Sequence, residues 1–284
     1  ITLPKAIEIG EYAFYGCMDL ETVSLPEVET IGEGAFEFCE KLQNITFGSK
    51  LSVINDGVFY GCSSLNLAAF DFDNITKVGK MSFLGTQMPE TLTLPKVESI
   101  DVQAFCEAEL VQTSQGLQFV PVKNPHLKTV NAPELRFLLE NAFYGSGALQ
   151  QFNAPKLEEI GSMVFVDTLI TEFEVTDNLR FVDYGAFTYA EKFETFYATV
   201  NGQKVFDVTF SNVMLDKGVL YTSTNKGYML SSYPAAKTDA EYAIPEGVVR
   251  IEFLAAYGNK NITKIVLPQT LTNIGNMSFY SCDK

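Results

Sequence analysis

The segment "IGEGAFEFC" (residues 31–39) recurs in altered form along most of this 284-residue chain. Its central phenylalanine, Phe36, has counterparts at Phe14, Phe59 and Phe83, spaced 22 to 24 residues apart. Self-similarity at a nearly fixed period indicates a repeat architecture. Aligning the copies on this residue gives ten anchors: Phe14, Phe36, Phe59, Phe83, Phe105, Phe143, Phe165, Phe187, Ala256 and Phe279.

Two further slots are restricted in each copy. The slot five residues before the anchor is aliphatic in all copies, and Ile31 fills it before Phe36. The slot one residue before the anchor is small or narrow, and Ala35 fills it there. A glycine often follows the aliphatic slot, as at Gly32, and is expected to allow a backbone bend that bulkier residues would resist. The aliphatic residue and the anchor therefore point into a common core.

A strand-like pattern follows the anchor. In "TVSL" (22–25), Val23 and Leu25 alternate with Thr22 and Ser24, which is the period-two signature of a half-buried strand. A unit of about 23 residues cannot bury its own apolar face, but stacked units can. The sequence therefore predicts coils whose strands pair in parallel, about 4.8 Å apart.

The combined pattern L-P-x-V-x-x-I-G-x-x-A-F-x-x-C-x-x-L-x-x-I-x-L-P resembles the BspA-type leucine-rich repeat. It is carried by "LPEVETIGEGAFEFCEKLQNITF" (25–47), "LEEIGSMVFVDTLITEFEV" (157–175) and "LPQTLTNIGNMSFYSC" (267–282). The resemblance implies a right-handed leucine-rich-repeat solenoid of about ten coils, with a parallel β-strand ladder and short helical turns. It also implies a non-catalytic protein, chiefly bacterial, that is secreted or attached to the cell surface and binds proteins, matrix or cells.

The whole chain, residues 1–284, is predicted to be one solenoid domain with two insertions. The first, 107–126, lengthens the spacing after Phe105. The second, 200–248, contains two β-rich runs, 218–222 and 227–234, joined by a segment with Asn and Gly that predicts an irregular β-hairpin. This hairpin is either an irregularity of the solenoid or a projecting element. In the second case three tyrosines would help to contact a partner: Tyr221, Tyr228 and Tyr233.

The outward side of the strand ladder is the other candidate ligand surface. Its residues are mostly uncharged and polar: Thr22, Ser24, Asn44, Thr46, Thr91, Thr93, Thr129, Asn131, Gln151 and Asn153, followed by Glu172, Glu174, Thr195, Tyr197 and Lys264. Threonine fits strands, and stacked Asn or Gln side chains can satisfy one another. Alternatively, the row is a recognition face that hydrogen-bonds a protein strand or a glycan.

Cysteine and histidine suggest no catalytic or metal site. Four of the five cysteines lie three residues after an anchor, where other copies carry Ala, Ser, Thr or Asn: Cys17, Cys39, Cys62 and Cys282, with Cys106 out of register. This small slot predicts buried free thiols, although disulfides between adjacent copies are also possible. With no Cys-x-x-Cys pair and a single histidine, His126, we expect no zinc, no cofactor and no catalytic triad.

The amino-acid composition restricts the possible binding partners. Thirty-five acidic and twenty basic residues give a net charge of −15, which disfavours nucleic acid. No apolar run reaches the roughly 18 residues of a membrane-spanning helix. Both ends of the sequence fall inside a repeat, which favours a segment of a longer or processed chain. The predicted function is a cell-surface or secreted binding and adhesion module for protein, extracellular matrix or glycan. The alternative is an elongated structural spacer that holds another domain away from the cell.

Overall fold

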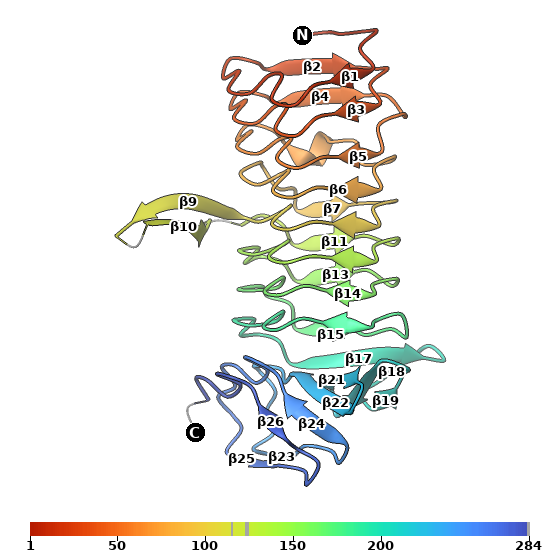
Figure 1. Cartoon of the computed structure of the whole chain (residues 1–284), viewed down its shortest axis with the longest axis vertical. Helices are drawn as coiled ribbons and strands as arrows, with labels where there is room; N and C mark the ends of the chain where they lie inside the picture. The colour runs from red at the N-terminus through yellow and green to blue at the C-terminus, as the bar shows by residue number, and fades with distance from the viewer. Residues whose placement is uncertain (115, 123–124, 283–284) are drawn as a thin grey trace. The chain divides into compact units, whose positions relative to one another are not determined.

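The computed structural model describes residues 1–114, 116–122 and 125–282. The chain divides into two compact units, residues 1–154 (unit 1) and 155–284 (unit 2). Each unit is built from coils whose short strands pair in parallel, as the repeat predicted (Figure 1).

In unit 1, the predicted ladder strands form two parallel sheets. The first pairs β2 (Thr22–Leu25) with β4 (Asn44–Phe47). The second contains β7 (Thr91–Thr93), β11 (Thr129–Asn131) and β13 (Gln151–Asn153). The aliphatic slot also lies in a two-residue strand, so that most coils carry two strands. These additional strands are β1 (Glu8–Ile9), β3 (Thr30–Ile31), β5 (Val53–Ile54), β6 (Lys77–Val78), β8 (Ser99–Ile100) and β12 (Phe137–Leu138).

The coil between β4 and β7 interrupts the ladder. It contains the 3-10 helix η1 (Leu67–Ala69), the only helix in the part of the chain that the structure describes. The Asn66 side chain accepts a hydrogen bond from the Ala68 N–H at 2.9 Å and so caps this helix. Elsewhere the segments around the anchors are successive tight turns, where the repeat pattern predicted short helical turns.

Left-handed residues flank the anchors, on both sides in nine of the ten copies. The residue two positions before the anchor has φ between 53° and 63° in every copy, from Tyr12 (54°) to Met277 (53°). The residue two positions after it is also left-handed in nine copies, for example Gly16 and Phe38. The exception is the copy of Phe105, where Glu107 leads into an insertion instead of closing the turn.

The glycines beside the aliphatic slot lie where a bulkier residue would not fit. Gly32, Gly79 and Gly275 are not left-handed. A Cβ atom at Gly32 would instead lie 2.5 Å from the Glu11 backbone nitrogen, and one at Gly275 would lie 2.8 Å from that of Phe253. These glycines are therefore required because the backbone of the neighbouring coil passes too close for a side chain.

The anchor rings form the core. In unit 1, stacked rings have centroid distances of 5.1 Å for Phe14–Phe36, 5.8 Å for Phe36–Phe59 and 5.5 Å for Phe59–Phe83. The side chains of Phe36, Phe59 and Phe83 are fully buried. The register taken from the sequence is thus the register of the packed core.

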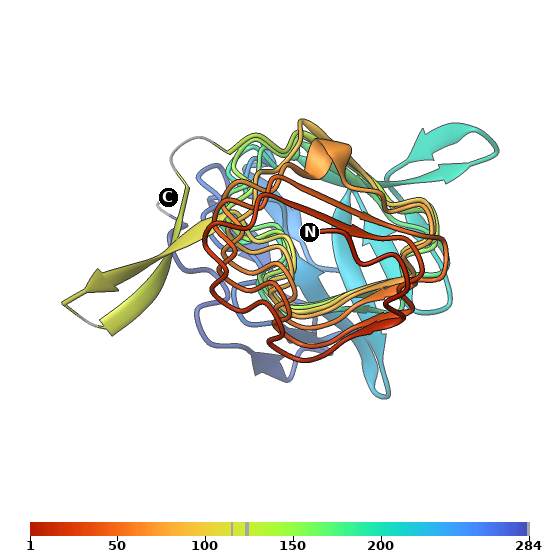
Figure 2. The same cartoon turned by 90° about the horizontal axis from the view of Figure 1, so that it is seen from above.

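The first insertion forms an antiparallel hairpin, β9 (Ala108–Thr113) and β10 (Gly116–Pro121). It extends away from the coils of unit 1 in both views (Figures 1 and 2). At its base, the Val122 N–H donates to the Glu107 carbonyl at 3.0 Å, and the Glu107 N–H donates to the Tyr144 carbonyl of the next coil at 2.9 Å. The coil therefore resumes its stacking directly around the hairpin.

In unit 2, the second insertion is built into a mixed sheet. Strands β19 (Val208–Thr209), β20 (Val213–Asp216), β21 (Val219–Thr224) and β22 (Gly227–Ser232) are antiparallel neighbours, and β21 and β22 form the predicted hairpin. Strand β22 then pairs in parallel with β24 (Val248–Ile251), which pairs with β26 (Asn273–Ile274). The remaining strands are β14 (Glu159–Ile160), β15 (Glu172–Glu174), β16 (Phe181–Val182), β17 (Thr195–Val200), β18 (Gln203–Val205), β23 (Glu241–Ala243) and β25 (Lys264–Val266).

Candidate functional site

The polar ladder is the set of ten outward residues on the ladder strands of unit 1: Thr22, Ser24, Asn44, Thr46, Thr91, Thr93, Thr129, Asn131, Gln151 and Asn153. All are exposed or half-buried. They are aligned across the strands, so that Thr22 faces Asn44 and Thr129 faces Gln151. Strand pairing thus brings these ten residues into two groups, one on each side of the coil that contains η1.

Some members of the polar ladder satisfy one another. The Thr46 hydroxyl donates to the Ser24 hydroxyl at 3.2 Å, and the Asn153 amide donates to the Asn131 amide oxygen at 2.7 Å. Each group retains further donor and acceptor capacity, because an amide offers two donors and a carbonyl oxygen with two lone pairs. The ladder therefore combines internal hydrogen bonding with groups that face solvent.

In unit 2, the corresponding positions include four charged residues, namely Glu172, Glu174, Glu241 and Lys264, beside the uncharged Thr195 and Tyr197. Lys204 pairs with Glu172, and Lys264 lies 2.9 Å from Glu241. The Tyr197 ring is half-buried under the Lys204 ammonium, which lies 4.1 Å from its centroid. Burial, followed by the nearby Glu174 carboxylate, raises the pKa of Tyr197. One face of this ring is therefore already covered by a cation.

The reading of the second insertion as a projecting tyrosine surface was wrong. Tyr221 is fully buried and Tyr233 is 4% exposed, because β21 and β22 belong to the sheet that covers the core of unit 2. The Tyr221 and Tyr242 hydroxyls are 2.8 Å apart, and Tyr242 donates to the Asp216 carboxylate at 2.6 Å. Tyr228 is half-buried and packs against the same core. Burial raises the pKa of Tyr221 and of Tyr242.

The cysteine slot is a hydrogen-bonding position as well as a small one. All five cysteines are free thiols. The Cys39 thiol donates to the Phe14 carbonyl at 3.1 Å, and the Cys62 thiol donates to the Phe36 carbonyl at 3.0 Å. Each thiol thus bonds the anchor of the preceding coil. Cys17 is exposed, contrary to the prediction of a shielded thiol.

Thiol titration at pH 8 is expected to modify Cys17 and to leave Cys39 and Cys62 intact until the protein unfolds. Burial raises the pKa of Cys39 to about 11 and raises that of Cys62 further. Only about 0.1% of the Cys39 side chains would be thiolate at pH 8, and the thiolate is the reactive form. A Cys17→Ser variant serves as the control, because it should lose the fast reaction. Reaction of Cys39 in the folded protein would contradict this assignment, and so would missing thiols after unfolding without a reductant.

A row of aromatic side chains along the turns of unit 1 was not predicted from the sequence. Tyr12 and Tyr15 have ring centroids 6.1 Å apart, Tyr15 and Phe38 are 5.8 Å apart, and Phe38 and Tyr60 are 5.0 Å apart. Tyr12 and Tyr15 are about half exposed. The sequence contains a pattern that indicates such a row, because the residue directly after the anchor is tyrosine in five copies: Tyr15, Tyr60, Tyr144, Tyr257 and Tyr280.

His126 is exposed, and its backbone N–H donates to the buried Glu107 carboxylate at 3.1 Å. Burial raises the pKa of Glu107. Within residues 1–114, 116–122 and 125–282, no group of three or more His, Cys, Asp or Glu side chains is arranged to hold a metal ion. In the same residues, no helix has the length and apolar character of a membrane span.

Comparisons with known proteins agree with this fold. A model of the BspA-type leucine-rich repeat region matches residues 1–112, 123–227 and 239–284 in six copies. The structure is similar to a leucine-rich cell surface protein from Faecalibacterium prausnitzii, with 20% identity and a TM-score of 0.61. It is also similar to a leucine-rich repeat protein from Bacteroides ovatus, with 18% identity and a TM-score of 0.55.

The alignment with the Faecalibacterium protein covers 98% of this chain and 65% of that protein. The alignment with the Bacteroides protein covers 99% of this chain and 72% of that protein. No curated protein matches the sequence. Identities of 18–20% support a common fold only. The model of the repeat region, in contrast, matches most of the residues of this chain and so identifies its family. On that match, this chain belongs to the BspA-type leucine-rich repeat family.

Proposed function

We propose that this chain is a non-catalytic, cell-surface or secreted module that binds a protein partner through the polar ladder of unit 1. The observation that carries the proposal is the composition of the ladder: ten uncharged polar side chains in register, in a chain with a net charge of −15. One of the similar structures belongs to a protein described as a cell surface protein, which supports the proposed location.

A rigid row of hydroxyl and amide groups suits a peptide partner. Such groups donate and accept hydrogen bonds, so that they can pair with backbone N–H and C=O groups of an extended segment. Extracellular matrix proteins are therefore suitable candidates.

Binding through the polar ladder is expected to depend weakly on salt, because the ladder has no charge to be screened. Binding is first tested on an array of matrix and secreted proteins. The affinity of any protein that binds is then measured by titration at several salt concentrations. The variant Asn131→Lys with Asn153→Lys should then weaken binding by about tenfold or more, since it places two bulky ammonium groups on the contact surface.

The matched control is Ser49→Lys with Ser52→Lys, which adds the same two charges at exposed positions of unit 1 outside the ladder strands. The control should bind as the wild type does. A steep salt dependence, or equal affinity of both double variants with the protein still folded, would contradict the ladder as the contact surface. A well-folded protein that binds nothing on the array would favour the structural spacer.

A further inference from the structure

The aromatic row is the set of four neighbouring rings on the turns of the first three coils: Tyr12, Tyr15, Phe38 and Tyr60. Successive ring centroids are 5.0–6.1 Å apart. The row belongs to the turns around the anchors, whereas the polar ladder belongs to the ladder strands. Tyr12 and Tyr15 are 47% and 53% exposed. The row therefore presents to solvent the kind of side chain that is enriched where proteins bind partners.

Left-handed glycines support the rings. A Cβ atom at Gly61 would lie 2.5 Å from the Phe38 ring, and one at Gly34 would overlap the Tyr12 ring. Each of these rings thus lies directly on the backbone of the next coil. The Tyr12 hydroxyl also donates to the Glu33 carboxylate at 2.8 Å. Rings held in this way lose little conformational freedom when a partner binds.

Carboxylates lie beside the rings. A Glu37 carboxylate oxygen would be 2.9 Å from a Cβ atom at Gly34, the position that the Tyr12 ring covers, so that these two side chains lie together. The slot three residues before the anchor is acidic in the same three coils and is filled by Lys80 in the fourth. The acidic residues in this slot are Glu11, Glu33 and Asp56.

The tyrosines of the row titrate as rings in a negative environment. The hydrogen bond to Glu33, burial, and the charges of Glu33, Glu37 and Glu11 raise the pKa of Tyr12. Burial, followed by the Glu37 carboxylate, raises the pKa of Tyr60. The field of Glu37 thus reaches rings on both neighbouring coils.

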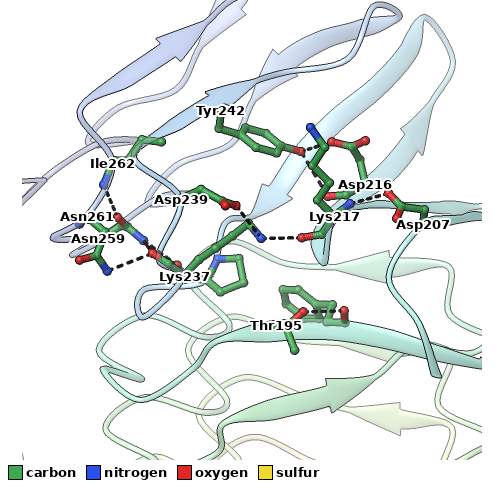
Figure 3. Close-up of polar contacts among 12 residues, drawn as sticks. Thr195, Asp207, Asp216, Lys217, Lys237, Asp239, Tyr242, Asn259, Asn261 and Ile262 are labelled. Carbon is green, nitrogen blue, oxygen red and sulfur yellow. Dashed lines mark hydrogen bonds and ion pairs between the residues drawn. The ribbon is translucent and has the colours of Figure 1, made fainter.

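The Glu37 carboxylate has no counter-ion. It is half-buried and makes no hydrogen bond or ion pair with the residues that the structure describes. Burial, followed by the Glu33 carboxylate, raises its pKa. By contrast, the Lys237 ammonium in unit 2 lies 2.9 Å from the Asp239 carboxylate (Figure 3). A cation bound at Glu37 would therefore supply the missing partner and relieve repulsion between two carboxylates.

The lysines of these coils do not neutralise the row. Residues 1–60 contain ten acidic residues and three lysines. Lys41 lies 2.6 Å from Asp19, and Lys50 lies 3.2 Å from Glu27, so that two of the three are paired with carboxylates outside the row. The first three coils therefore keep a net negative charge.

Rings beside carboxylates suit a guanidinium group. It can stack on an aromatic face while its N–H groups pair with a carboxylate. An anion or a zwitterion would bring its own negative group toward the same carboxylates. A neutral apolar group would bury Glu37 further without giving it a partner, which is unfavourable.

We propose that the aromatic row, with Glu33 and Glu37, is a docking site for arginine side chains on an extended basic segment of a partner protein. Three coils at a spacing of about 4.8 Å span about 10 Å, and alternate side chains of an extended segment are about 7 Å apart. The row thus has room for two arginines. This inference goes beyond the polar ladder, because it concerns a second surface and charged contacts.

The test is isothermal titration of the whole chain, at low salt, with the acetylated and amidated peptide Ser-Arg-Ser-Arg-Ser. A Kd of about 0.1 mM is expected. A peptide with citrulline in place of both arginines keeps the planar side chain without its charge and should bind at least about tenfold more weakly. No binding of the arginine peptide, or equal binding of the citrulline peptide, would overturn the proposal.

Tyr15→Ala should weaken binding of the arginine peptide by about tenfold. The matched control is Tyr280→Ala, since Tyr280 fills the same slot and is 54% exposed, but Asn276 stands where Glu11 precedes Tyr15. The control should bind as the wild type does. Equal loss in the two variants would reject the aromatic row as the site.

Glu33→Gln with Glu37→Gln should also weaken binding by about tenfold. Its control is Asp71→Asn with Asp73→Asn, which removes two charges at exposed positions of unit 1 outside the turns of the row. Equal loss in both double variants would mean general attraction to an acidic chain and would contradict the site. The Asn131→Lys with Asn153→Lys variant should still bind the arginine peptide, so that failure of the ladder and failure of the row are distinguishable.

Discussion

Replacing Phe59 with alanine is expected to lower the free energy of unfolding by about 3–5 kcal/mol. The Phe59 ring is fully buried and stacks between Phe36 at 5.8 Å and Phe83 at 5.5 Å, with Phe70 packed edge-on at 5.5 Å. Removing the ring leaves an aromatic-sized cavity. Phe36, Phe70 and Phe83, which surround it, cannot move into this cavity without losing their own contacts. Denaturant unfolding followed by circular dichroism measures the loss.

Lys77→Ala is the control for this measurement, because Lys77 is an exposed residue of the neighbouring coil. It should change the free energy of unfolding by less than about 0.5 kcal/mol. A loss of less than about 1 kcal/mol in Phe59→Ala would show that the anchor register does not describe the core.

Asn259→Ala is expected to cost about 3–4 kcal/mol, because this buried side chain makes four hydrogen bonds of roughly 1 kcal/mol each. Its amide donates to the Pro234 and Lys237 carbonyls at 3.0 and 2.9 Å. Its oxygen accepts from the Asn261 and Ile262 N–H groups, both at 2.9 Å. Alanine would leave all four backbone groups without this partner.

The exposed Asn276 provides the comparison for the same chemical change. Asn276→Ala should leave the unfolding midpoint in place, whereas Asn259→Ala should shift it clearly. Equal midpoints for the two variants would mean that the four bonds around Asn259 are replaced at no cost, which would contradict its structural role.

The periodic part of the fold could be predicted from the sequence. Phe36 and Ile31 recur at fixed spacing because each coil buries the same two positions, and Val23 alternates with Thr22 because one face of the ladder is solvated. From these patterns, the stacked coils, the register of the core and the position of the polar ladder could be predicted.

Contacts between different coils could not be predicted in this way. Gly32 is required by the backbone of the preceding coil, and the Cys39 thiol donates to a carbonyl of that coil. The residue types within one repeat do not show which backbone atoms of the preceding coil lie close to Gly32 and Cys39. Tyr221 was misplaced for a similar reason, because its burial depends on β22 pairing with β24, about twenty residues later in the chain.

The route of the chain around the β9–β10 hairpin has a consequence for protein engineering. The Phe105 N–H donates to the Ala142 carbonyl at 3.0 Å, just as the Phe83 N–H donates to the Ala104 carbonyl at 3.0 Å, although the first pair spans the whole insertion. The coil is thus closed at the base of the hairpin, independently of the length of chain beyond it. Residues 108–121 therefore mark a natural grafting position, at which a foreign loop or epitope could be displayed without altering the scaffold beneath it.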